Sequence, residues 1–193
     1  MAKSSGPQLS FSPGRIDPAN SSFAETRKSL AGEFKARGKK LFVVVNHFSS
    51  KNDDQPLMGH NQPPTRFTEG PRHGQAAVVN GFVNDILDIA PEANVIVLGD
   101  INDLEFSETV DILEGDGELF SAIKTLPANE RYSYVFEGNS QVLDQILLSR
   151  NLYEHFPYAY DVVHVNSEFS SQASDHDPSV VRLRLTGRPA PKP

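Results

Sequence analysis

Short apolar runs separated by polar turns predict a strand-rich fold into which helices are inserted. Within the strand predicted over residues 41–46, the run 41–45 (LFVVV) is apolar and mostly β-branched, which is typical of a strand buried on both faces. Residues 95–98 (VIVL) have the same character and end at Gly99. Further strands are predicted over residues 29–34, 132–136, 142–148, 161–166 and 180–185.

Turn-forming residues connect two pairs of these strands. The basic, glycine-containing segment KARGKK predicts a hairpin between residues 29–34 and 41–46. A helix over residues 23–37 is the competing interpretation of this region. The segment EGNSQ predicts a second hairpin, between residues 132–136 and 142–148.

Two segments have the apolar spacing of helices. Residues 75–89 place an apolar face at helical spacing, and Pro91 stops the helix. Ser107 is the predicted N-cap of a short helix that ends near Leu113. Residues 52–71 are polar and contain four prolines, so they predict a long loop, which Arg72 and Gln75 are expected to anchor. The order of elements indicates an α/β or α+β sandwich.

Polar segments flank one predicted domain. A chain of 193 residues is the length of a single domain, because domains contain about 100–200 residues. Residues 1–22 are rich in Ser, Pro, Gly and Asn and predict a loose N-terminal arm. Residues 186–193 contain three prolines and predict a disordered tail. The domain is therefore expected over residues 23–185.

Composition excludes several kinds of chemistry. The chain has no cysteine, which excludes disulfides, thiolate metal sites and a cysteine nucleophile. No run reaches the about 18 apolar residues of a membrane span, and the first ten residues lack the apolar core of a signal peptide. The chain as written is thus expected to be cytoplasmic.

Charge is distributed unevenly along the sequence. Residues 1–40 contain eight basic and three acidic residues, whereas the rest contains ten basic and twenty-two acidic residues, and the whole chain carries −7. An acidic body repels phosphate polymers unless bound divalent cations reverse the local field. A nucleic-acid substrate therefore implies a bound cation, and the alternative is that this protein does not bind nucleic acid.

Polar side chains follow the apolar strands at four places. These are His47, Asp100 with Asn102, Asp144, and the segment SDHDP at residues 174–178. Each motif alone also fits a turn or a structural histidine. Asp144 lies inside an apolar run, where a carboxylate requires a partner such as a histidine or a metal ion.

Taken together, these four groups of polar residues indicate a particular chemistry more specifically than any one of them does. Asp100, Asn102 and Asp175 are hard oxygen donors, which favour Mg²⁺, Mn²⁺ or Ca²⁺ over zinc in a chain without cysteine. Two histidines and a buried aspartate supply proton transfer and its orientation. Together they suit metal-assisted hydrolysis of a phosphate ester.

The ordered motifs NHFSSK, GDIND, LDQILLS and SDHDP resemble the endonuclease/exonuclease/phosphatase superfamily, which has the deoxyribonuclease I-like fold. The stretches RIDPANSSF, VVVNHFSSK, RHGQA, ERYSYVFEGNSQVLDQILLS and VHVNSEF are similar to the bacterial extracellular nucleases of that superfamily. The resemblance covers residues 15–185, nearly the whole chain.

The resemblance implies a role for each motif residue. His47 would contact the scissile phosphate and either protonate the leaving group or stabilise charge. Asp100 would orient or deprotonate the attacking water and contact a metal ion, and Asn102 would hold the phosphate. Asp144 would orient His176, the general base or phosphate-polarising histidine, because an aspartate–histidine pair fixes the tautomer and raises imidazole basicity.

The resemblance also implies that this chain corresponds to the C-terminal half of a four-layer αββα sandwich. In the family, the N-terminal half supplies an asparagine and a metal-binding glutamate. Of the acids before His47, namely Asp17, Glu25 and Glu33, none has that context. We therefore expect Asp175 to remain as one firm metal ligand and one sheet face to be exposed. We expect this chain alone to have little or no nuclease activity and to require the missing half or a partner chain.

The expected function is that of a metal-dependent phosphodiester hydrolase, a nuclease acting as an endonuclease on DNA or RNA, with Mg²⁺ as cofactor. The full-length parent is expected to be extracellular. The alternatives are a phosphatase or sphingomyelinase-like phosphodiesterase of the same superfamily, and a non-catalytic half that functions with a partner chain.

Overall fold

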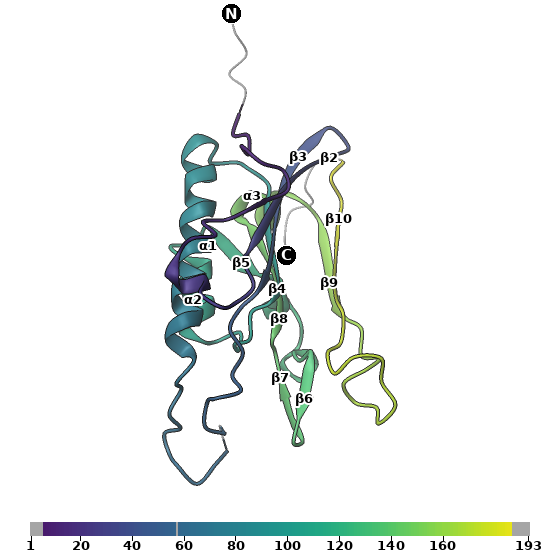
Figure 1. The fold of residues 1–193 in the computed structure, drawn as a ribbon. Helices are drawn as coiled ribbons and strands as arrows, with labels where there is room; N and C mark the ends of the chain where they lie inside the picture. Colours follow the sequence, from purple (N-terminus) through teal and green to yellow (C-terminus); the bar gives the residue numbers. More distant parts are fainter. Residues whose placement is uncertain (1–5, 57, 187–193) are drawn as a thin grey trace, which may run out of the picture.

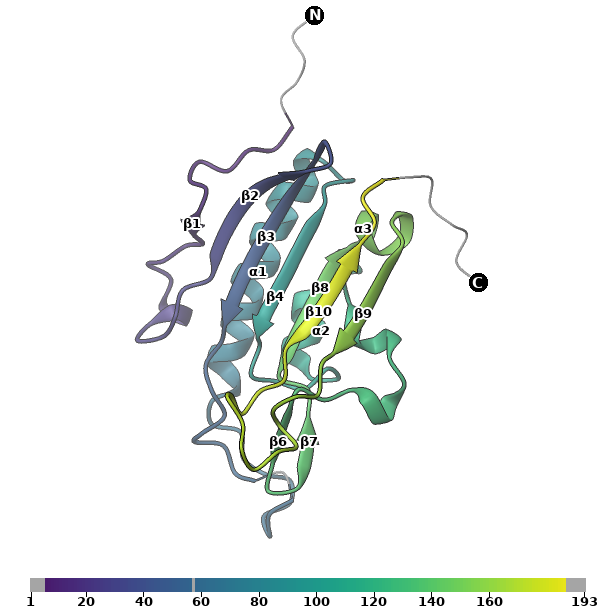
Figure 2. The same cartoon turned by 90° about the vertical axis from the view of Figure 1, so that its right-hand side faces the viewer.

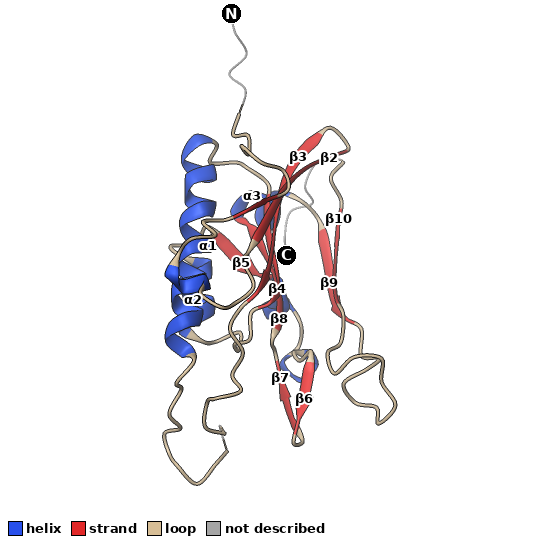
Figure 3. Ribbon diagram, in the orientation of Figure 1, coloured by secondary structure: helices blue, strands red, loops and turns tan. Residues whose placement is uncertain are grey.

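A six-stranded sheet forms the centre of the protein, with helices on one face and a two-stranded sheet on the other (Figures 1 and 3). The coordinates are a computed structural model, which describes residues 6–56 and 58–186. In spatial order, the central strands are β1 (Gly14–Arg15), β2 (Leu30–Ala36), β3 (Lys39–His47), β4 (Val95–Asp100), β8 (Asp144–Ser149) and β5 (Leu119–Ser121).

A parallel crossover unit builds the middle of the sheet. Strands β3 and β4 are parallel, with Phe42 opposite Val95 and His47 opposite Asp100. Helix α1 (Glu69–Ile89) connects them and packs with α2 (Glu108–Glu114) on one face. Because the two strands run in the same direction, the residues at their carboxyl ends meet at one edge of the sheet.

Side chains alternate between the two faces of the central strands, as the pleat requires. One face of β3, β4 and β8 packs against the helices; its core residues are Phe42, Val44, Val95, Val97 and Leu147, with Ala76, Val79, Val83 and Ile86 from α1. The other face packs against β9 (Tyr158–Val162) and β10 (Ser179–Leu183), which pair in antiparallel fashion. The buried residues between the two sheets include Ile96, Ile146 and Leu148 of the central sheet and Tyr160 and Val162 of β9.

The second sheet leaves part of the central sheet uncovered. Figure 2 shows β10 in front of β8, with β9 on one side of it and β4, β3 and β2 on the other. Phe34 is 56% exposed and Val45 is 46% exposed. The prediction that residues 41–45 are buried on both faces is therefore correct only for the helix-facing side, where Phe42 and Val44 are buried.

Both predicted hairpins have two-residue turns in the left-handed region, which suits the twist of paired strands. Arg37 and Gly38, with φ of 49° and 79°, join β2 to β3, so the competing helix over residues 23–37 is wrong. Glu137 and Gly138, with φ of 50° and 79°, join β6 (Tyr134–Phe136) to β7 (Asn139–Gln141). The hairpin partner is thus β7, and β8 instead pairs with β4 in the central sheet.

Helix α1 begins earlier than the apolar pattern predicts. It starts at Glu69, and its first turns bury Arg72 and Gln75. Hydrophobic periodicity does not detect a buried face made of polar side chains, so the predicted start at residue 75 is too late and the loop ends at Thr68. The described structure also contains η1 (Ser21–Phe23), η2 (Ala122–Thr125), η3 (Ala128–Glu130) and α3 (Arg150–His155).

The N-terminal segment is attached to the domain. Gly14 and Arg15 pair with β2, and Ile16 and Phe23 are buried. The expectation of a loose arm over residues 1–22 is wrong for this part, because the sheet supplies its backbone partners. The predicted tail over residues 186–193 lies, apart from Thr186, outside the described residues. Within residues 6–56 and 58–186, every helix is too short or too polar to cross a bilayer.

Candidate active site

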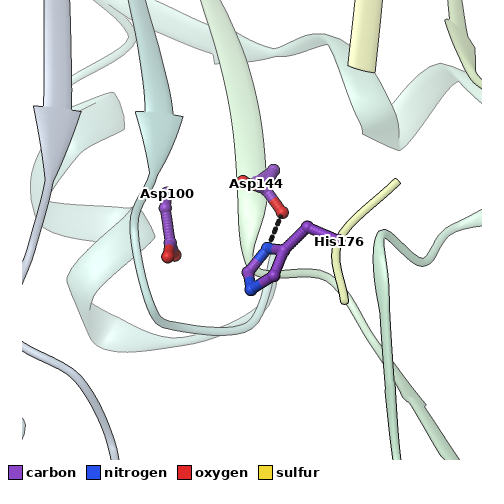
Figure 4. Close-up of side chains that lie close together, drawn as sticks. All are labelled: Asp100, Asp144 and His176. Carbon is purple, nitrogen blue, oxygen red and sulfur yellow. Dashed lines mark hydrogen bonds and ion pairs between the residues drawn. The ribbon is translucent and has the colours of Figure 1, made fainter. Parts of the chain in front are cut away.

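Three titratable side chains meet at the carboxyl end of β4 (Figure 4). Asp100 is the last residue of β4, and Asp144, the first residue of β8, lies directly opposite it. His176 comes from the segment between β9 and β10 and forms an isolated bridge with Tyr134. One potential ligand atom from each of Asp100, Asp144 and His176 lies within 4.8 Å of the others.

Asp144 and His176 form a hydrogen-bonded pair. The distance from His176 Nδ1 to Asp144 Oδ2 is 2.6 Å. This hydrogen bond raises the pKa of His176, although partial burial opposes the charged form. Because Nδ1 is occupied by Asp144, Nε2 is the nitrogen left to exchange a proton with a substrate.

Ser133 holds the carboxylate of Asp144 in place. Its hydroxyl donates to Asp144 Oδ2 at 2.8 Å and accepts hydrogen bonds from the backbone N–H groups of Leu143 and Asp144. Its carbonyl accepts a hydrogen bond from Asp177 N at 2.7 Å. The predicted site did not include Ser133, whose role depends on hydrogen bonds that form only when the residue before β6 meets the start of β8.

Asp177 fixes the segment that carries His176. Its buried carboxylate accepts hydrogen bonds from the backbone N–H groups of Val165, Asn166 and Ser167, and from the Ser167 hydroxyl. Burial opposes ionisation, yet these hydrogen bonds dominate and hold the pKa of Asp177 well below its usual range. The carboxylate next to His176 is therefore structural.

Asp100 is in an environment that disfavours its charge. Burial and then the negative charge of Asp144 raise the pKa of Asp100, and the hydrogen bond from Asn102 N at 2.9 Å offsets this only in part. His47 Nε2 lies 3.5 Å from Asp100 Oδ2. His47 thus joins Asp100, Asp144 and His176 in one cluster, as the motif residues predicted.

Two other predicted residues lie next to this cluster. Asn102 has a φ of 54°, and its side-chain amide donates to the Phe48 carbonyl at 3.0 Å, which ties the loops after β3 and β4 together. Asp175 is exposed and adds to the negative field at His176. The predicted roles of Asn102 in phosphate binding and of Asp175 in metal binding stay predictions.

Gly99 sets the spacing between the two strands that carry the cluster. Its φ is 126°, and a Cβ atom there would lie 2.1 Å from the carbonyl oxygen of Asn46. Real Cβ atoms do not approach backbone oxygen so closely, so a side chain at this position would separate β3 from β4. The His47–Asp100 contact therefore depends on glycine at position 99.

Arg72 anchors the long loop beside the site. Its fully buried guanidinium donates to Asp103 Oδ2 and to Asp54 Oδ2, both at 3.0 Å, and to Thr68 Oγ1 at 2.6 Å. Burial works against the charge of Asp54, but hydrogen bonds from Thr68 and Arg72 outweigh it and lower the pKa of Asp54. The prediction that Arg72 anchors the loop is confirmed, whereas the role of Asp103 was missed.

A comparison of the sequence with known families covers most of the chain. Residues 8–177 match the Endonuclease/Exonuclease/phosphatase family. The chain belongs to this family. The predicted resemblance is thereby confirmed, and family membership indicates a hydrolase. No curated protein sequence matches the chain.

Several solved structures share the fold of this chain. The mannosyl-6-phosphatase of Bacteroides thetaiotaomicron is 20% identical, with a TM-score of 0.58 over 82% of this chain and 57% of that one. The human Nocturnin catalytic domain with a bound sulfate anion is 19% identical, with a TM-score of 0.55, and the match covers 81% of this chain and 52% of that one. A Staphylococcus aureus beta toxin variant with bound magnesium ions is 15% identical, with a TM-score of 0.52, and the match covers 79% of this chain and 56% of that one.

These likenesses confirm the predicted deoxyribonuclease I-like α/β fold. The chain spans a little over half the length of each of the three structures.

The cluster contains donor atoms of the kinds that bind divalent cations, although Asp144 Oδ2 and His176 Nδ1 are hydrogen-bonded to each other, so that Asp100 has the carboxylate not committed to that pair. Asp100 and Asp144 provide carboxylate oxygens, and His176 provides an imidazole nitrogen, all within 4.8 Å of one another. Carboxylates suit Mg²⁺, Mn²⁺ and Ca²⁺, and imidazole is also a ligand of transition metals. Burial and the charge of Asp144 raise the pKa of Asp100, and a cation bound here would oppose both effects.

Proposed function

We propose that this protein is a cation-dependent phosphodiesterase that acts on nucleic acids. The observation that carries the proposal is the convergence of Asp100, Asp144 and His176 within 4.8 Å, with the Asp144–His176 hydrogen bond of 2.6 Å, in a member of a hydrolase family. Such an aspartate–histidine pair provides a proton-transferring group in a fixed orientation.

Each residue has a role in the proposed reaction. His176 exchanges a proton through Nε2 or polarises the phosphate, and Asp144 keeps its ring oriented. Asp100 orients the attacking water. His47, 3.5 Å from Asp100, contacts the phosphate and protonates the leaving group. Donors aimed at the phosphate oxygens stabilise the charge that develops during hydrolysis.

Asp100 is the proposed primary ligand of the cation, because Asp144 and His176 are bonded to each other. Asp175 and the side-chain oxygen of Asn102 are the proposed additional oxygen ligands, and this all-oxygen set favours Mg²⁺. A bound cation supplies positive charge that polarises the phosphoryl oxygens. In this acidic protein it also reduces repulsion between the site and a polyanionic substrate.

Cation binding provides the first test. In a calorimetric titration with Mn²⁺, Asp100→Ala is expected to weaken binding by at least about tenfold, since it removes the proposed primary ligand. Asp88→Ala, at an exposed position in α1, is the control and is expected to bind as the unchanged chain does. Equal affinities for the three proteins would contradict the proposed metal site.

Hydrolysis provides the second test. Nicking of supercoiled plasmid DNA and cleavage of single-stranded RNA are measured with Mg²⁺, with Mn²⁺ and with EDTA. We expect slow cation-dependent cleavage, reduced by about 10²-fold or more in His176→Ala. His155→Ala, at an exposed histidine in α3, is the matched control. Cleavage that persists undiminished in His176→Ala, or the absence of cleavage by the folded chain, would contradict the proposal.

Phosphomonoester hydrolysis is the second candidate function. The likeness to the Bacteroides mannosyl-6-phosphatase favours it, because that protein has the same fold. Rates on p-nitrophenyl phosphate and on bis(p-nitrophenyl) phosphate distinguish the candidates. A nuclease is expected to prefer the diester, and a preference for the monoester would favour the phosphatase.

A further inference from the structure

Lys51 is a partly buried cation that the proposed reaction does not use. It lies in the loop after β3, and its ammonium donates a hydrogen bond to Gln141 Oε1 at 3.0 Å. Among the residues that the structure describes, Lys51 forms no ion pair and its ammonium has no other hydrogen-bond partner. Because an ammonium group has three N–H donors, two of them are available to an external acceptor.

Backbone contacts hold the segment that presents Lys51. Ser49 N donates to Gln75 Oε1 at 2.9 Å, and the Ser50 carbonyl accepts a hydrogen bond from Arg72 at 3.3 Å. Gln75 and Arg72 are both buried in the first turns of α1. Lys51 is therefore held through its backbone neighbours by the helix and through its ammonium by β7.

The β6–β7 hairpin connects Lys51 to His176 through Tyr134. Gln141 lies directly opposite Tyr134, and residues directly opposite each other in an antiparallel pair carry their side chains on the same face. The rings of Tyr134 and His176 are in contact, with 4.9 Å between their centroids, and the two residues form a backbone bridge. The side chains of Lys51 and Tyr134 thus meet the same face of the hairpin, which Figure 2 shows beyond the carboxyl end of β4.

The hydroxyl of Tyr134 is a second available donor beside the cluster. It makes no hydrogen bond to any part of the chain that the structure describes. Burial raises the pKa of Tyr134, and the negative charges of Asp175 and Asp100 raise it further. The hydroxyl therefore stays protonated, as a donor must, and it lies within the electric field of the active-site carboxylates.

The surroundings of Lys51 suit an incoming anion. Burial lowers the pKa of Lys51, and the charges of Asp103, Asp54 and Asp100 oppose this effect only in part. An anion that accepts hydrogen bonds from the ammonium would oppose it further. Phosphate oxygens are such acceptors, and they form short, charge-assisted hydrogen bonds with lysine.

We propose that Lys51 and Tyr134 form a donor pair that binds the oxygens of the reacting phosphate. The ammonium of Lys51 and the hydroxyl of Tyr134 donate to two non-bridging oxygens and stabilise the negative charge that develops on them during hydrolysis. Gln141 holds the ammonium in place. This inference rests on the proposed function, because the phosphate is the one that faces His176, and it applies to diester and monoester substrates alike.

Phosphate binding, measured without turnover, tests the donor pair. Inorganic phosphate is titrated into the protein with Mg²⁺ present, and binding is followed by the NMR shifts of the His176 ring protons. Lys51→Met is expected to weaken binding by about tenfold, because it removes a charged donor and keeps a side chain of similar length. Tyr134→Phe is expected to weaken it by about threefold, because it removes a neutral hydrogen bond and keeps the ring against His176.

Two variants control for the loss of a charge and of a hydroxyl elsewhere. Lys35→Met changes an exposed lysine of β2, and Tyr132→Phe removes a hydroxyl that donates to Glu168. Both are expected to bind phosphate as the unchanged protein does. Lys51→Arg keeps the charge and is expected to keep most of the affinity.

A purely structural role of Lys51 would give a different result. Because burial disfavours its charge, Lys51→Met is expected to leave the midpoint of urea denaturation unchanged or higher. Its affinity for Mn²⁺ is expected to be unchanged or higher, since Asp100 loses a neighbouring positive charge. A lower midpoint with an unchanged phosphate affinity would assign Lys51 to the buried network of Arg72 and would overturn the donor pair.

The outcomes distinguish this inference from the proposed function. The lack of a saturable shift at His176, or an affinity that Lys51→Met leaves unchanged, overturns the donor pair even where His176-dependent cleavage is found. Binding that depends on Lys51 and Tyr134, in a protein that hydrolyses no phosphate ester, supports the donor pair while the proposed reaction fails.

Discussion

His176 is positioned by contacts on several sides. Asp144 binds its Nδ1, and the ring of Tyr134 lies over it at a centroid distance of 4.9 Å and an angle of 43°. Ser133 in turn holds Asp144 at 2.8 Å. Because the His176 ring is already oriented, little conformational entropy is lost when a substrate binds. Such pre-orientation favours efficient proton transfer.

The Asp144–His176 pair predicts a measurable titration effect. Asp144→Asn removes the hydrogen bond to a carboxylate that is the main cause of the raised pKa of His176, so this pKa is expected to fall. In the unchanged protein, the Asp144–His176 pair makes its full contribution to stability at pH values below about 6.5, the ordinary pKa of histidine. This contribution is lost as the pH rises through the higher pKa that His176 has in the folded protein.

The measurement is an NMR titration of the histidine ring protons in metal-free protein. Asp88→Asn serves as the control, since Asp88 is exposed on α1. An unchanged His176 midpoint in Asp144→Asn would show that the pair does not set its protonation.

At the scale of elements, the first turns of α1 connect three segments around the site. Arg72 holds the loop before α1 through Asp54, and the loop after β4 through Asp103. Gln75 accepts a hydrogen bond from Ser49 N at 2.9 Å and donates to the Ser22 carbonyl at 2.9 Å. The loops that follow His47 and Asn102 are therefore fixed to one rigid helix.

Arg72→Ala is expected to lower the free energy of unfolding by about 3–5 kcal/mol, because it leaves two nearly buried carboxylates without their cation. Urea denaturation followed by circular dichroism gives this value. Arg66→Ala removes an exposed ion pair with Glu69 and is expected to cost about 0.2–1 kcal/mol. Similar losses in the two variants would contradict the buried network.

Much of the candidate active site could be predicted from the sequence, because its residues lie at the ends of recognisable apolar strands. His47, Asp100 and Asp144 adjoin apolar strands, and a polar residue that follows such a strand is visible in the pattern. Ser133 and Asp103 could not be found in this way, since their roles come from contacts across 11 and 31 residues of sequence. Strand β5, with three residues, is too short to give a periodic signal.

At the scale of the whole molecule, the central sheet keeps one partly exposed apolar face over β2 and β3. Phe34 is 56% exposed, and its ring lies over Gly32, where a Cβ atom would be 2.9 Å from it. Val45 on the neighbouring strand is 46% exposed. Contiguous apolar surface of this kind promotes association between proteins.

Self-association is the expected consequence in solution. Sedimentation velocity is predicted to show a concentration-dependent increase in mass for the unchanged chain, and Phe34→Gln is predicted to shift the dissociation constant upward by about tenfold. Phe136→Gln changes an equally exposed phenylalanine, at 52%, in the β6–β7 hairpin and serves as the control. A chain that stays monomeric at high concentration would refute the prediction.

Gly99 has a consequence for how genetic data on this protein are read. It carries no functional group, yet the carbonyl of Asn46 occupies the space that a side chain would need. In a saturation mutagenesis screen, every replacement of Gly99 is therefore depleted as strongly as replacements of His176 or Asp100. Gly99 is intolerant to substitution because no Cβ atom fits there. A mutagenesis screen alone would misread this intolerance as a catalytic role.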